Sequence, residues 1–212
     1  FTMHGGTISG NTASGSGGGV YISYGGGSSF TMHGGTISGN TASSVGGVYV
    51  DGAFTMQGGA ISNNTASSGS GGGVYVSRDG AFTMQGGTIS NNTASSGSGN
   101  GGGYGGGVYV DGTFTMQGGT ISNNTASAGR GGGVYVDSGG AFTKADADDG
   151  DSGIIYGSLK ADGSTAEDAG LGNTASAGGH AVYYGSGPKT RNATLGAGDD
   201  ISTTDTSSPP WD

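Results

Sequence analysis

Apolar and polar residues alternate along the chain within three short segments that recur in the same order. The segments read F-T-M, T-I-S and V-Y-V, and stretches rich in Gly, Ser and Asn separate them. Alternation with a period of two is typical of β-strands, whose successive side chains point to opposite faces. None of the segments reaches the length of a helix. The pattern therefore predicts an all-β chain in which Phe, Met, Ile and Val point inward and Thr, Ser and Tyr point outward.

The segments belong to a repeat that reads F-T-M-x-G-G-x-I-S-x-N-T-A-S, followed by a Gly/Ser tract of variable length and then by V-Y-V or V-Y-I. A strand of three residues gains stability only when it stacks on its copies in neighbouring units. Such stacking predicts a right-handed, single-stranded parallel β-helix with three short strands in each turn and about seven turns. The copies begin at Phe1, Phe30, Phe54, Phe82, Phe114 and, in truncated form, Phe142.

The chain divides into a regular and an irregular part. Residues 1–141 hold the regular repeats, with four acidic and two basic residues, whereas 142–206 hold degenerate turns with an acidic insertion at 144–172. We expect the degenerate turns to cap the solenoid, because a bare last turn would expose unpaired strand edges. Residues 207–212 are predicted to form a tail. Further turns are expected ahead of Phe1, which lies inside the motif.

Composition narrows the classes of protein and of site. Gly accounts for 54 of the 212 residues, a share that without a repeat would predict disorder, but much of it occupies fixed positions between the strands. The net charge of -9, with six Lys and Arg, argues against a nucleic-acid partner. No apolar run has the length of a membrane span, so no membrane insertion is expected in this segment. The sequence has no Cys, which excludes disulfides and Cys-ligated metals.

One unit of the repeat resembles a known class of bacterial surface repeat. Ile89–Val110 reads I-S-N-N-T-A-S, a Gly-rich tract and G-G-G-V-Y-V, and is similar to the repeats of polymorphic outer-membrane proteins and autotransporter passengers. Those repeats join an Asn-x-Ala step to a Gly-Gly-aliphatic strand. The resemblance covers Phe1–Val136 and returns weakly at Asn173–Tyr184. It implies a right-handed β-helix, export to the bacterial cell surface and an adhesive or structural role.

The outward Tyr of V-Y-V is the first candidate for a functional surface. One ring in each turn would form a column that either stacks in register and stabilises the sheet, or binds a sugar ring or a neighbouring molecule. Loops of variable length flank this strand, among them 96–107, and variable loops often carry recognition. The column consists of Tyr21, Tyr49, Tyr75, Tyr109 and Tyr135, with Tyr183 as a further candidate.

The invariant Asn of each repeat is predicted to form a structural ladder at a corner of the turn. Asn tolerates the left-handed backbone conformation that a corner requires, and its amide can hydrogen-bond to the next turn. The ladder contains Asn11, Asn40, Asn64, Asn92 and Asn124.

Three carboxylates, of Asp51, Asp111 and Asp137, follow the V-Y-V strand at equivalent positions. Asp111 and Asp137 are expected one turn, about 5 Å, apart, a separation suited to a carbohydrate-cleaving site. Against this reading, Asp51-Gly52 and Asp111-Gly112 are ordinary turn dipeptides, and no Arg, Lys or His shares their column. Turn residues are the favoured interpretation, and no catalytic residue is predicted.

A second acidic group lies in the insertion and offers the hard oxygen ligands that Ca²⁺ prefers. The spacing of an EF-hand is not met, because Ala145 and Ala147 would stand at ligand positions, so a solvated acidic loop is favoured. Ca²⁺ is the one cofactor that the sequence suggests. The group consists of Asp146, Asp148, Asp149 and Asp151.

Two further columns are best explained as surface polar residues. His4 and His33 occupy a position that holds Gln in later repeats, which indicates exposed polar residues rather than a metal pair. The outward Thr and Ser of T-I-S form a grid like that of some ice-binding proteins, but Ala60 interrupts the Thr file, and a soluble β-surface is the favoured explanation. The hydroxyls are those of Thr7, Thr36, Thr88, Thr120, Ser9, Ser38, Ser90 and Ser122.

The sequence therefore favours a non-enzymatic, extracellular structural or adhesive module of a bacterial surface protein or fibre. It would act by displaying loops and the Tyr column. Its expected partners are other copies of itself, neighbouring surface proteins or glycans. A carbohydrate-binding or carbohydrate-cleaving (pectate-lyase-like) β-helix is the alternative, and ice binding is a distant third.

Overall fold

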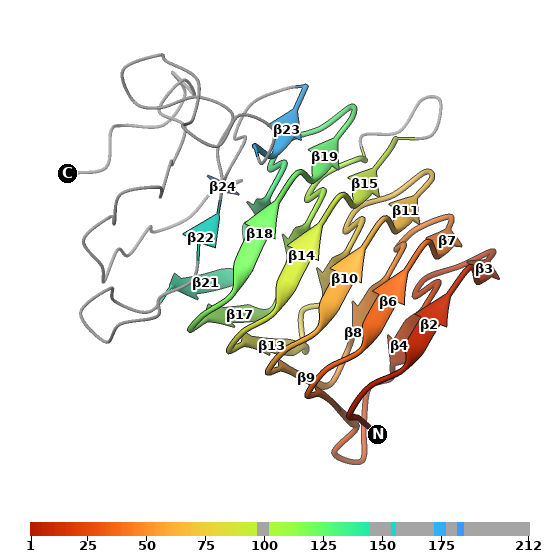
Figure 1. Cartoon of the computed structure of the whole chain (residues 1–212). Helices are drawn as coiled ribbons and strands as arrows, with labels where there is room; N and C mark the ends of the chain where they lie inside the picture. Colours follow the sequence, from red (N-terminus) through yellow and green to blue (C-terminus); the bar gives the residue numbers. More distant parts are fainter. Residues whose placement is uncertain (97–101, 145–153, 156–171, 177–181, 185–212) are drawn as a thin grey trace.

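The computed structural model describes residues 1–96, 102–144, 154–155, 172–176 and 182–184. Every regular element in this part of the chain is a β-strand, and the strands of successive turns lie side by side along a solenoid (Figure 1). The strands form four parallel sheets of six strands each. The all-β parallel solenoid predicted from the repeat is confirmed.

Each sheet is built from one segment of the repeat. The F-T-M sheet contains β1 (Thr2–Met3), β5 (Ser29–Met32), β9 (Ala53–Met56), β13 (Ala81–Met84), β17 (Thr113–Met116) and β21 (Ala141–Lys144). The T-I-S sheet contains β2 (Thr7–Ser9), β6 (Thr36–Ser38), β10 (Ala60–Ser62), β14 (Thr88–Ser90), β18 (Thr120–Ser122) and β22 (Ile154–Ile155). The T-A sheet contains β3 (Thr12–Ala13), β7 (Thr41–Ala42), β11 (Thr65–Ala66), β15 (Thr93–Ala94), β19 (Thr125–Ala126) and β23 (Thr174–Ala175). The V-Y-V sheet contains β4 (Val20–Ile22), β8 (Val48–Val50), β12 (Val74–Val76), β16 (Val108–Val110), β20 (Val134–Val136) and β24 (Val182–Tyr184).

Each turn has four strands, so the prediction of three was wrong. The additional strand is the T-A pair that follows the ladder Asn. Its two residues pair in parallel with their copies, as in the registers Thr65 with Thr93 and Ala66 with Ala94. Two residues are too few to show an alternation along the sequence, and only the neighbouring turns reveal them as a strand.

The number of turns is slightly lower than predicted. Five turns, from β1 to β20, follow the repeat closely, and a sixth consists of β21 to β24 with undescribed segments between them. The last part of the predicted degenerate turns, residues 185–206, lies outside the described residues. Most of the predicted acidic insertion and the whole predicted tail lie outside them as well.

The inward side chains fill the solenoid with ladders of identical residues. Phe54, Met56 and Ile61 are at most 1% exposed, and so are their copies in the central turns. The Phe rings stack along the axis with centroids 4.7 to 5.3 Å apart. Burial of each such side chain contributes about 1.5 to 3 kcal/mol. The core is therefore one continuous apolar column, as the alternation predicted.

The corners between strands depend on Gly for two different reasons. Gly59, which precedes β10, has a φ of 86°, a conformation that a residue with a Cβ rarely adopts. At Gly107 the reason is space, because a Cβ there would lie 2.6 Å from the carbonyl oxygen of Gly133 in the next turn. These requirements explain why Gly recurs at fixed positions of the repeat.

Candidate functional site

The Tyr residues of the V-Y-V sheet stack continuously along one side of the solenoid. Parallel pairing places each ring next to its copy, as with Tyr75 and Tyr109. Neighbouring centroids are 4.6 to 5.5 Å apart, and neighbouring ring planes deviate by 6 to 18°. We call this the Tyr column, and it contains Tyr21, Tyr49, Tyr75, Tyr109, Tyr135 and Tyr183.

Stacking covers the faces of the rings inside the column. The side chain of Tyr21, at the first turn, stacks on Tyr49 and is 56% exposed, whereas Tyr183 in the sixth turn is 7% exposed. Tyr104, which precedes β16, adds a further ring 4.8 Å from that of Tyr135. Between these ends the column offers solvent mainly ring edges and phenolic groups. Sugars stack on the faces of aromatic rings, so this geometry favours the stabilising role of the stack over sugar binding.

Burial and negative charge raise the pKa of the phenols in the central turns of the column. Burial raises the pKa of Tyr75 and of Tyr135 to about 12, and the carboxylates of Asp111 and Asp137 add to the two shifts. The pKa of Tyr109 is raised further, first by burial and then by its hydrogen bond to Asp137. A phenolate is disfavoured beside a carboxylate because the two negative charges repel each other. These three phenols are therefore neutral hydrogen-bonding groups over the ordinary range of pH.

Each of the three predicted turn carboxylates has a partner on the neighbouring turn. The Tyr109 hydroxyl donates to Asp137 Oδ2 at 2.6 Å, and the Ser77 hydroxyl donates to Asp51 Oδ1. Asp111 and Asp137 follow paired strands and so stand one turn apart, as expected. The two hydrogen bonds fix Asp51 and Asp137 along the edge of the Tyr column, and the partner of Asp111 is Arg78.

Two basic residues also reach this face, which the sequence analysis did not anticipate. Arg78 Nε lies 4.0 Å from Asp111 Oδ2, and its side chain is 81% exposed. The Arg130 guanidinium lies 4.6 Å from the Tyr183 ring centroid and donates to the hydroxyl of that residue. Arg78 does not occupy the repeat position of the carboxylates, but its side chain approaches them from the next position. The signal was present in the sequence, since Arg78 directly follows Ser77, the residue at the position of the carboxylates.

The Asn residues form a buried amide ladder. The Oδ1 of Asn92 accepts hydrogen bonds from both the backbone N and the Nδ2 of Asn64, at 3.0 Å each. The Nδ2 of Asn92 donates to Asn124 Oδ1 and to the Ile61 carbonyl. This pattern is the same in each turn, and Asn173 extends it into the sixth. Because the oxygen and the nitrogen of each side-chain amide both have hydrogen-bond partners, these Asn side chains can be buried inside the solenoid at 0% exposure.

The left-handed conformation expected at the ladder Asn occurs one residue earlier. Asn63, Asn91 and Asn123 have φ of 55 to 56°, and Gly10 and Gly39 take the same place in the first two turns. The backbone therefore turns at this preceding residue, and the ladder Asn that follows points inward. The corner and the ladder are two separate requirements of the repeat.

The remaining candidate residues do not come together in one site. The possible Ca²⁺ ligands Asp146, Asp148, Asp149 and Asp151 lie outside the described residues, and the described part contains no group of three or more His, Asp or Glu able to hold a metal.

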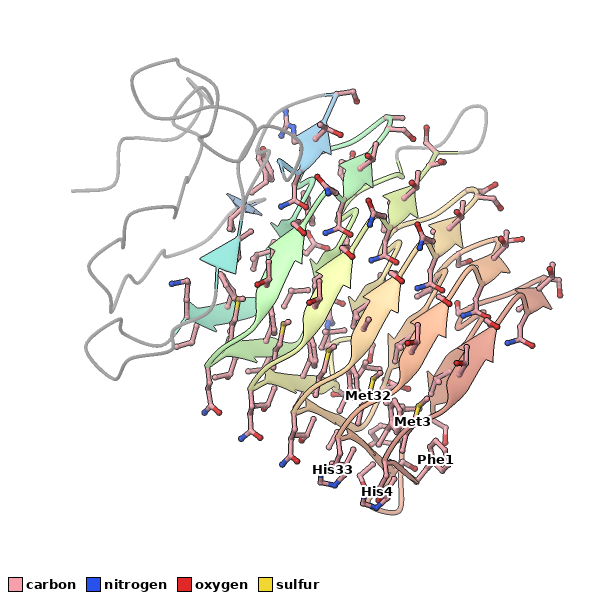
Figure 2. The ribbon with its side chains drawn as sticks, viewed as in Figure 1. Phe1, Met3, His4, Met32 and His33 are labelled. Carbon is pink, nitrogen blue, oxygen red and sulfur yellow. The ribbon has the colours of Figure 1, made fainter. Side chains whose placement is uncertain are left out.

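The T-I-S hydroxyls do not form an evenly exposed grid, since Ser122 is only 4% exposed. No observation tests ice binding, which stays a prediction. His4 and His33 lie side by side on the outside of one corner, with Met3 and Met32 on the side of the core (Figure 2).

Comparison with known proteins identifies the fold family. A family described as "Right handed beta helix region" matches residues 2–195. No curated protein and no solved structure matches the chain. The described residues form no helix long and apolar enough to cross a membrane. The register, the four parallel sheets and the extent of this match agree, and the chain belongs to the right-handed β-helix family.

Proposed function

We propose that this chain is a non-enzymatic structural and adhesive module of an extracellular bacterial surface protein or fibre. The module is a rigid support that holds recognition loops at fixed places. It interacts through those loops and through the hydroxyl groups and ring edges of the Tyr column. Its partners are other copies of itself or neighbouring surface molecules. The resemblance to autotransporter passengers supports the assignment to the cell surface.

The observation that carries this proposal is the separation of a constant core from variable loops. Inward Phe, Met, Ile, Val and Asn side chains repeat in register through the described turns. Chain length varies mainly in the segment between the T-A strand and the V-Y-V strand, from five residues at 43–47 to thirteen at 95–107. A core that repeats while one corner varies is suited to display.

The first experiment tests whether the long loop, residues 95–107, mediates binding. We suggest replacing residues 95–107 by the five residues 43–47 of the same chain, which join the same two strands in another turn. Sedimentation velocity and negative-stain images would compare the association of the two chains, and circular dichroism would control for folding. We expect the wild type to associate or to bind a surface partner and the shortened chain to lose this property. Equal behaviour of the two chains would contradict display by this loop.

A carbohydrate-cleaving β-helix is the second candidate, and one observation favours it. Asp111 and Asp137 stand on adjacent turns, and Arg78 lies beside Asp111, so two carboxylates and a cation share one edge of the sheet. Against catalysis, Asp137 is engaged by the Tyr109 hydroxyl. Incubation with acidic and neutral polysaccharides, followed by a reducing-end assay, should show no cleavage. Cleavage that disappears in Asp111→Asn/Asp137→Asn would replace our first proposal by this one.

A further inference from the structure

Two histidines occupy equivalent positions on neighbouring turns at one outer corner of the solenoid. His4 follows β1 and His33 follows β5, and the backbone N of His33 donates to the carbonyl of Met3 at 2.9 Å. Their ring centroids are 4.7 Å apart, and the ring planes are parallel. Both side chains are exposed and point away from the core, as Figure 2 shows. Exposure agrees with the interchange of His and Gln at this position.

Later turns carry Gln at the position of His4 and His33. There the Gln side chains can bond to one another, and Gln85 Nε2 donates to Gln117 Oε1 at 3.2 Å. The two imidazoles instead stack face to face. In the part of the chain that the structure describes, no side-chain hydrogen bond or ion pair engages either ring. Their nitrogen lone pairs therefore remain available to an external ligand.

The sequence alone favours surface polar residues over a metal pair, but on the strength of this juxtaposition we propose that His4 and His33 form a bidentate site for a divalent transition-metal ion. Neutral imidazole is a ligand suited to Cu²⁺, Ni²⁺ and Zn²⁺, whereas Ca²⁺ and Mg²⁺ take oxygen ligands. Because no described cluster contains three or more such ligands, the pair supplies the protein ligands, and water occupies the other positions of the ion. The order of stability for divalent ions places Cu²⁺ first.

Binding one ion requires the two imidazoles to rotate out of their parallel stack. Metal–nitrogen bonds of about 2.0 to 2.1 Å place two ligand nitrogens at most about 4.2 Å apart. In the present stack the ring centroids are 4.7 Å apart and the ring planes are parallel, so the nitrogen lone pairs, which lie in those planes, do not converge on one point. Both side chains are exposed, and rotation about their side-chain bonds can turn one nitrogen of each ring toward a shared ion. The backbone need not move, because adjacent strands are held about 4.7 to 4.9 Å apart. The solenoid thus holds the second ligand close to an ion that has bound the first.

The first test measures metal binding by isothermal titration in a non-chelating buffer. The sequence contains three His, and His180 lies outside the described residues, so the parent chain carries His180→Gln. We expect one Cu²⁺ per chain, with weaker binding of Ni²⁺ and Zn²⁺. His4→Gln and His33→Gln, which install the residue found at this position in later turns, should each weaken Cu²⁺ binding by about tenfold or more. Unchanged affinity in both variants would overturn the proposal.

A second test transplants the pair. In a His4→Gln/His33→Gln/His180→Gln chain, the substitutions Gln85→His and Gln117→His occupy adjacent turns and should restore one site. Gln57→His and Gln117→His lie two turns, about 9.6 Å, apart and should not restore it. Circular dichroism confirms the fold of each variant. Equal affinity of the adjacent and the separated pair would show that spacing along the solenoid does not create the site.

Discussion

The phenolic oxygen of Tyr109 lies 2.6 Å from Asp137 Oδ2, although the two residues are 28 positions apart in the sequence. They meet because their two turns stack on each other. Tyr109 belongs to β16, and Asp137 follows β20, the next strand of the same sheet. The bond joins the Tyr column to the row of carboxylates at its edge. It also places a negative charge beside a phenol that burial already keeps protonated.

The first prediction concerns stability at alkaline pH. The pKa of Tyr75 and Tyr135 is about 12 in the folded chain, above the ordinary value of 10, so the unfolded chain releases these protons first. The contribution of the neutral phenols is complete below pH 10, and it declines as the pH rises toward 12. We expect the free energy of unfolding to fall over this interval, measured by denaturant titration at pH 8, 10 and 11.5. Absorbance at 295 nm that shows all ten Tyr ionising near pH 10 in the folded chain would contradict this.

The second prediction concerns the acceptor of the Tyr109 bond. Asp137→Ala leaves the half-buried hydroxyl without its partner, and it should lower the free energy of unfolding by about 1 to 2 kcal/mol. Asp79→Ala removes an exposed carboxylate from the loop that follows β12, and it should change stability by less than about 0.5 kcal/mol. Chemical denaturation of the three chains makes the comparison. If both variants behaved like the wild type, the bond would have no role in stability.

The third prediction concerns the Asn ladder. Asn92→Ala removes the acceptor of two Asn64 donors and the donor to the Ile61 carbonyl, all at 0% exposure of the Asn side chains. Each unsatisfied buried group costs about 1 to 3 kcal/mol, so the variant should be strongly destabilised. Asn11→Ala, at the exposed end of the ladder, is the matched control and should cost much less. Similar melting temperatures for the two variants would argue against a ladder that stabilises through burial.

The fourth prediction concerns the close approach of two turns. Gly107→Ala places a Cβ 2.6 Å from the Gly133 carbonyl oxygen, and it should cost at least about 1 to 3 kcal/mol through overpacking. Gly5→Ala introduces a Cβ with no atom within 4 Å at a residue without positive φ. We expect thermal unfolding of Gly5→Ala to match the wild type. A tolerated Gly107→Ala would mean that neighbouring turns can separate locally.

The inward ladders of this fold could be predicted because they follow a simple alternation. Phe54, Met56 and Ile61 repeat at fixed spacing, and parallel stacking of identical units places like residues together. The T-A strand could not be recognised in the same way, because Thr65 and Ala66 form a strand only through bonds to other turns.

The details of the site escaped prediction for a related reason. The reach of the Arg78 side chain to Asp111, and the bond between Tyr109 and Asp137, depend on which residues of different turns face each other across variable loops. The position of the left-handed residue at Asn63 rather than Asn64 depends on which of two adjacent Asn turns inward. Spacing along one repeat determines neither property.

The identical register of every pair of regular turns has a consequence for how such a gene can change. If the segment from Ala53 to Gly80 were deleted, β5 would meet β13 with Phe opposite Phe and Met opposite Met, as it now meets β9. Unequal recombination between repeats would therefore add or remove whole turns without a new core having to evolve. Copy number would set the reach of the protein in steps of about 4.8 Å.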